Sequence, residues 1–216
     1  MNPQPAWRRR EFLRAVGGAG CLGALARGAG AAVATPTPIR RPAGYFALQP
    51  GDPAVLQPGN TRIVADRLLQ LPQVAGLTIR ARWSWIHPSE GKVELGFLEG
   101  QADRCRRLAK SYKLLVMTGA ECSPSWLGGA WHARAPVPWS AELRAHYGTL
   151  VEQLGRRFSD DPLCVGVHMT GPTHPSAEMH PAPGIETVPG YSSDAMIEAW
   201  KSSIDAYAAA FPHTAA

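Results

Sequence analysis

Short apolar runs alternate four times with longer amphipathic segments, and this alternation permits only a few folds. The expected strands cover residues 44–48, 76–83, 113–118 and 162–170, and the expected helices follow them at 61–71, 95–110, 140–158 and 194–211. Four successive strand–helix units predict an α/β fold with a parallel sheet and right-handed crossovers, either doubly wound or closed into a barrel.

The loops favour the barrel. Those after the second, third and fourth strands carry most of the Trp, His, Pro and Gly residues, as at the working face of a (β/α)8 TIM barrel. No Gly-rich phosphate fingerprint follows a strand, which argues against nucleotide binding. Because such a barrel takes about 250 residues, we expect only about the first four βα units here, either continued elsewhere or paired with another copy.

The amino terminus resembles a twin-arginine export signal, because Arg8, Arg9 and Arg10 precede Glu11, Phe12, Leu13 and Arg14. This order fits two arginines, any residue, Phe, Leu and a basic residue. A weakly apolar stretch follows that is too rich in glycine to span a bilayer, and an A-x-A cleavage site ends at Ala34. We therefore expect a signal peptide over 1–34, a Pro-rich spacer over 35–43 and a partial catalytic-type barrel domain over 44–216. The mature protein is predicted to be periplasmic or extracellular without a membrane anchor; lipidation at Cys21 is the alternative.

The predicted signal holds five of the 22 basic and one of the 17 acidic residues, which leaves 17 against 16 and a net charge of about +1. No basic stripe remains, so nucleic acid is not an expected partner. Cys105, Cys122 and Cys164 form an odd set in separate segments, which predicts buried packing residues rather than disulfides. Nothing in the sequence sets an oligomeric state.

Two loop motifs carry a family resemblance over residues 44–216. The first is W-x-x-x-x-P-x-x-G after the second strand, and the second is P-x-W-L after the third, formed by Trp83, Pro88 and Gly91 and by Pro124, Trp126 and Leu127. In these motifs the chain resembles the clan A glycoside hydrolases, most closely their β-galactosidase-like branch. The resemblance implies a glycosidase that cleaves O-glycosidic bonds of a carbohydrate, with no cofactor and no metal.

The resemblance also implies a general-acid glutamate at the end of the fourth strand. Glu178 is our candidate because it is the first carboxylate in that loop, although the family's Asn-Glu pair is absent. The family's nucleophile follows strand seven, so the 216 residues alone are expected to be inactive, since glycoside hydrolysis requires two carboxyl groups. The alternative for Glu178 is a solvated loop carboxylate.

Five residues are predicted to bind substrate: Arg82, Trp85, Trp126, His168 and His174. Tryptophan rings offer rigid faces for sugar stacking, and Arg82 could bind a sugar hydroxyl or the carboxylate of the acid. The structural alternatives are core packing for the tryptophans, above all Trp83, and a salt bridge for Arg82.

Two other functions stay open. His168, His174, Glu178 and His180 contain the donor types of a metal-dependent hydrolase, but proline on both sides of His174 opposes a helix that would align it with Glu178. A non-catalytic carbohydrate-binding module would use the Trp-rich loops alone and would not need the second carboxylate.

Overall fold

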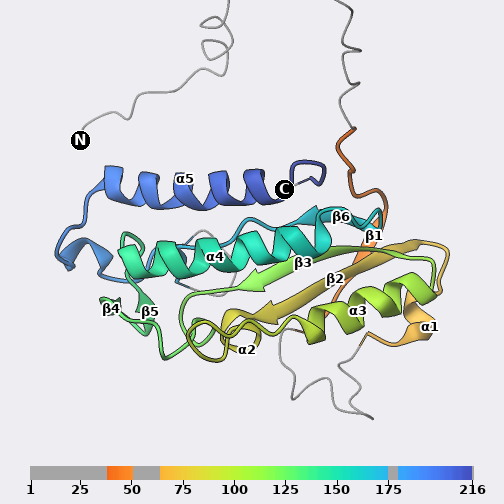
Figure 1. The fold of residues 1–216 in the computed structure, drawn as a ribbon, viewed down its shortest axis with the longest axis horizontal. Helices are drawn as coiled ribbons and strands as arrows, with labels where there is room; N and C mark the ends of the chain where they lie inside the picture. Colours follow the sequence, from red (N-terminus) through yellow and green to blue (C-terminus); the bar gives the residue numbers. More distant parts are fainter. Residues whose placement is uncertain (1–37, 51–63, 175–179, 216) are drawn as a thin grey trace, which may run out of the picture. The chain divides into compact units, whose positions relative to one another are not determined.

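The computed structural model describes residues 38–50, 64–174 and 180–215, all within one compact unit, Thr37–Ala216. The predicted signal peptide and Glu178 lie outside these residues. Four parallel strands form one sheet in the order β1-β2-β3-β6 (Figure 1), with the bounds Tyr45–Leu48, Val74–Arg82, Ser111–Met117 and Cys164–Val167. The α/β class with a parallel sheet is confirmed, and the architecture is that of the first part of a (β/α)8 barrel.

Alternating residues of β2 build the main core. Leu77, Ile79 and Ala81 are fully buried and pair in register with Tyr112, Leu114 and Val116 of β3. The helices α3, Gly96–Arg107, and α4, Ala141–Phe158, cover this face (Figure 1), and their buried leucines belong to the same cluster. Burial of these side chains is the main stabilising contribution to the fold.

Helix α4 begins as predicted at Ser140, whose Oγ accepts a hydrogen bond from the Leu143 amide. Helix α5, Ser193–Ala210, begins one residue before the predicted start at 194. The Oγ of Ser192 accepts a hydrogen bond from the Ala195 amide, whereas Asp194 lies in the first turn. Both residue types favour a helix start, because serine satisfies a free amide and a carboxylate near the amino end complements the helix dipole.

Other helix and strand boundaries also differ from the predicted ones. Trp83, which we expected within the second strand, starts the short helix α2, Trp83–Ile86, and is fully buried as a structural residue. Helix α1 covers Asp66–Leu69, and positions 61–63 of the predicted helix lie outside the described residues. The loop after β3 contains an unpredicted antiparallel pair, β4 at Trp131–His132 and β5 at Ala135–Pro136, and a 3-10 turn covers Ile185–Thr187.

The free edge of β6 is joined by the segment 213–215. The Val167 amide donates to the Ala215 carbonyl at 2.8 Å, and Gly166 and Ala215 form a parallel bridge. Arg40 forms a parallel β-bridge with Thr214 of the same segment. The segment 213–215 therefore pairs with the sheet beside β6.

Cys105, Cys122 and Cys164 are free and buried, as predicted. Burial raises the pKa of the Cys105 thiol to about 11 and that of Cys164 to about 12, so both stay protonated near neutral pH. Within the described residues, no helix is both long and apolar enough to cross a membrane.

Gly155 sets the approach of α4 and α5, which lie side by side (Figure 1), because a Cβ there would come within 2.4 Å of the Ala210 carbonyl oxygen. We expect Gly155→Ala to lower the free energy of unfolding by about 1–3 kcal/mol through this clash, measured by urea denaturation. Gly148→Ala is the control in the same helix, where nothing lies within 4 Å. It should stabilise the protein by about 0.5–1 kcal/mol, and equal effects of the two substitutions would contradict this packing.

Candidate functional site

The carboxyl ends of β2, β3 and β6 meet at one edge of the sheet, because all three strands are parallel. Figure 1 shows the arrowheads of β2 and β3 directed toward α2 and the β4–β5 hairpin. All five predicted substrate-binding residues lie at this edge. Arg82 is the last residue of β2, and the segments that follow the strands contain Trp85, Trp126, His168 and His174.

The structure brings Arg82 and Trp85 into contact. The guanidinium carbon of Arg82 lies 5.6 Å from the centre of the Trp85 ring, a cation–π distance. Trp85 in turn meets Phe97 edge to face, with the ring centroids 6.2 Å apart, and packs on the edge of the core. Trp85 therefore holds the Arg82 head in place at the end of β2.

The second face of the sheet carries Arg80 and Arg82, which alternate with the core residues of β2. Arg80 pairs in register with Leu115 and Arg82 with Met117. Leu115, Met117 and Cys122 form a small apolar cluster, separate from the main core. We call this face, defined by these five residues, the arginine face.

Trp126 lies in a different group, the His87 cluster, which consists of Trp83, His87, Trp126 and His146. The Trp126 Nε1 donates to the His87 carbonyl at 2.8 Å, and the Trp83 Nε1 donates to His87 Nδ1 at 3.1 Å. The Trp126 ring centroid lies 4.6 Å from that of His87 and 5.1 Å from that of His146. These contacts join the loops after β2 and β3 to α4.

His87 is buried, and both this burial and the neighbouring His146 lower its pKa. The Trp83 indole can only donate, so Nδ1 of His87 must be the acceptor and the ring is neutral in this arrangement. Protonation would place a proton on Nδ1 and break the bond to Trp83. The sequence analysis missed this residue, although His87 lies inside the first loop motif.

A lowered folded-state pKa means that the stability contributed by neutral His87 is present above its unfolded pKa of about 6.5 and is lost as the pH falls below it. We expect the free energy of unfolding to fall between about pH 7.5 and about pH 5, and His87→Gln to make this decline shallower. Denaturant titrations across this range measure both slopes. The exposed His180→Gln is the control, and a steep decline that persists in His87→Gln would rule out His87 as its source.

His174 joins the loops after β3 and β6. Its carbonyl accepts from the Ala120 amide at 2.8 Å, and its Nε2 lies 3.1 Å from the Ala133 carbonyl oxygen. Gly119 makes this close approach possible, because it has a φ of +77° and a Cβ there would lie 2.2 Å from the His174 carbonyl oxygen. The side chain of His174 thus has a structural contact at the carboxyl edge.

His168 is exposed just beyond β6, where its amide donates to the Leu114 carbonyl at 2.9 Å. It lines an open groove of about 310 Å³ together with Lys113, Gly166 and Met169. This volume is in the lower range of small-ligand sites, about 300–1,000 Å³. The groove lies on the same side of the sheet as the arginine face.

Glu121 is a carboxylate at this edge that the sequence analysis did not consider. It follows β3 by four residues, has a φ of +66°, and places its carboxylate 2.8 Å from the Arg134 guanidinium. Its backbone carbonyl lies 3.4 Å from Nη1 of Arg82. Its position after the third strand could have identified it, because a residue there lies at the carboxyl edge of a parallel sheet.

The described residues contain no group of three His, Cys, Asp or Glu side chains that could hold a metal ion. Glu178 lies outside these residues, so neither its predicted role as an acid nor the metal hypothesis that includes it is tested.

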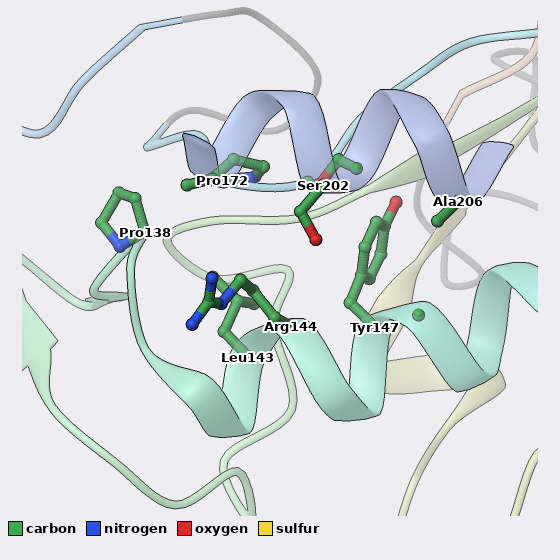
Figure 2. A pocket seen from close by; sticks show the side chains of 11 residues that line it. Pro138, Leu143, Arg144, Tyr147, Pro172, Ser202 and Ala206 are labelled. Carbon is green, nitrogen blue, oxygen red and sulfur yellow. The ribbon is translucent and has the colours of Figure 1, made fainter. Parts of the chain in front are cut away.

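A second cavity lies between α4 and α5 (Figure 2). Arg144 and Tyr147 project into this region from α4, and Ser202 and Ala206 project from α5. Its volume is about 30 Å³, which is room for one or two water molecules and too little for a sugar ring. The cavity between α4 and α5 is therefore not a candidate sugar site.

No known family profile matches the chain, and no curated protein matches its sequence. Its fold is similar to that of solved glycoside hydrolases. The cold-adapted β-galactosidase from Rahnella sp. R3 matches with a TM-score of 0.52 and 14% identity, over 84% of this chain and 35% of that protein. GH5_18 from Streptomyces cattleya, solved with GlcNAc, matches with a TM-score of 0.52 and 12% identity, over 82% and 44%. The chain therefore spans less than half of these structures, and the likeness shows the fold.

Proposed function

We propose that this protein is an exported glycoside hydrolase that acts on O-glycosidic bonds of a carbohydrate. The observation that carries the proposal is the fold likeness to β-galactosidase and GH5_18 over more than four fifths of the chain. The aromatic and cationic residues at the carboxyl edge support it, because catalytic groups of such folds come from the ends of the strands.

The proposed roles follow from the chemistry of each side chain. Glu178 is the general acid that protonates the leaving oxygen. Arg82, fixed on Trp85, binds an oxygen-bearing group of the substrate, and the partly exposed faces of Trp85 and Trp126 contact the sugar ring. His168 and His174 complete the substrate site on the β6 side.

We expect Glu178→Gln to lower glycosidase turnover by roughly 10²–10⁴-fold in a protein that joins these residues to the remaining βα units, because the amide cannot donate the acid's proton. The measurement is release of nitrophenol from a panel of nitrophenyl glycosides. Glu186→Gln is the control, since Glu186 is an exposed glutamate in the same connection. Sugar binding without hydrolysis of any substrate would favour a non-catalytic carbohydrate-binding module, and wild-type turnover of Glu178→Gln would remove Glu178 from the mechanism.

Export by the twin-arginine route is part of this proposal. Replacing Arg9 and Arg10 together by lysine should retain the protein in the cytoplasm, because lysine keeps the charge but not the guanidinium. Cell fractionation with an antibody to the protein measures the distribution. Arg27→Lys, a change downstream of the motif, is the control, and unchanged export of the double variant would contradict this route.

A further inference from the structure

His87 connects the indole at the start of α2 to one of the predicted sugar-binding rings. It is only 2% exposed, and its Nδ1 accepts a hydrogen bond from Trp83 Nε1 at 3.1 Å. Its ring centroid lies 4.6 Å from that of Trp126, and its backbone carbonyl accepts from Trp126 Nε1 at 2.8 Å. His87 therefore supports Trp126 through both its ring and its backbone, while Trp83 fixes the orientation of the imidazole.

This arrangement accepts only the neutral form of His87. An indole N–H can only donate, so a proton on Nδ1 would leave two donors facing each other. The new charge would also be buried, and both a buried ion and an unpaired buried donor are costly. A cation–π contact with the Trp126 ring would offset only part of this cost, because the imidazolium has lost its solvation and its hydrogen bond.

The titratable groups that face the cluster add to this preference. The ring centroid of His146, on α4, lies 6.5 Å from that of His87, so a charge on one imidazole opposes a charge on the other. Burial and, after it, His146 lower the pKa of His87. Two carboxylates lie nearby, but their partners are other groups. Glu90 has its carboxylate 3.9 Å from His146 Nε2, and Glu142 accepts from the Ser140 hydroxyl at 2.7 Å.

We propose that His87 is a positioning residue for sugar binding, which keeps the Trp126 ring in its binding orientation only while the imidazole is neutral. This inference rests on the proposed glycoside hydrolase function and adds a pH dependence to its substrate site. When His87 gains a proton, the bond to Trp83 breaks and the imidazolium moves toward solvent. Trp126 then loses a ring on which it packs and keeps only the edge-to-face contact with His146. The affinity for sugar falls as a result.

Proton linkage limits the size of the effect. The positioned form binds fewer protons, so it is favoured above the ordinary histidine pKa of about 6.5 and loses up to about thirtyfold in relative population by pH 5. We expect the affinity of the 216-residue chain for methyl β-D-galactoside or methyl β-D-glucoside to fall by about three- to thirtyfold between pH 7.5 and pH 5. Titration of the nitrogen-15-labelled chain measures this affinity from the indole N–H signal of Trp126, and circular dichroism confirms that the chain is folded at each pH. Without sugar, the Trp83 and Trp126 signals should shift with one common midpoint.

Four variants separate positioning from a merely structural role. His87→Gln should bind sugar with a flat pH profile, because its amide oxygen accepts from Trp83 and does not titrate. His87→Leu should lower the affinity at every pH, because it removes the acceptor. His146→Gln should make the decline shallower by removing the neighbouring charge, which provides the test if neither His87 variant folds. His213→Gln, in the segment 213–215 outside the cluster, is the control and should leave the profile unchanged.

The outcomes distinguish this inference from the proposed function. Equal sugar affinity of the unchanged chain at pH 7.5 and pH 5, or a decline that persists in His87→Gln, would overturn the inference and leave the glycosidase proposal standing. Binding of neither sugar at any pH would instead contradict the sugar site itself. A common midpoint of the Trp83 and Trp126 signals that disappears in His87→Gln would support the control of the Trp126 ring by His87 in either case.

Discussion

The two-sided packing of β2 underlies both the fold and the candidate site. One set of alternating residues, which includes Ile79 and Ala81, is buried under helices, and this burial fixes the register of β2 against β3. A shift by one residue would place arginines in the apolar core, which is energetically prohibitive. Because side chains alternate along the strand, Arg80 and Arg82 must lie on the opposite face. The sequence of β2 therefore specifies the core and the arginine face together.

Contacts between loops hold the carboxyl edge of the sheet together. The His87 cluster ties the loops after β2 and β3 to α4, and His174 and Gly119 tie the loops after β3 and β6 to each other. Several aromatic and imidazole groups that the sequence presents as ligand-binding residues thus have structural partners in the protein. Trp126 shows both aspects, since its Nε1 is used internally while its ring stays partly exposed.

Periodicity predicted the four strands and the two long helices closely, because their buried faces are long and regular. Periodicity did not predict the parts of the fold that depend on the backbone conformation of a few residues. Trp83 begins a helical turn at the strand end, and the β4–β5 hairpin turns through Ala133 and Arg134, both with left-handed φ values that neither residue type predicts. The carboxyl edge was predictable from topology, whereas the environment of Arg80 depends on side chains that are brought together only by the fold.

The bridge between Arg40 and Thr214 bears on the order of folding. The Arg40 guanidinium donates to the Thr214 hydroxyl at 2.8 Å across a sequence separation of 174 residues. Contacts of such separation close large loops and form slowly compared with the local βα units. The segment just after the predicted signal is thus secured only after residue 214 has emerged from the ribosome.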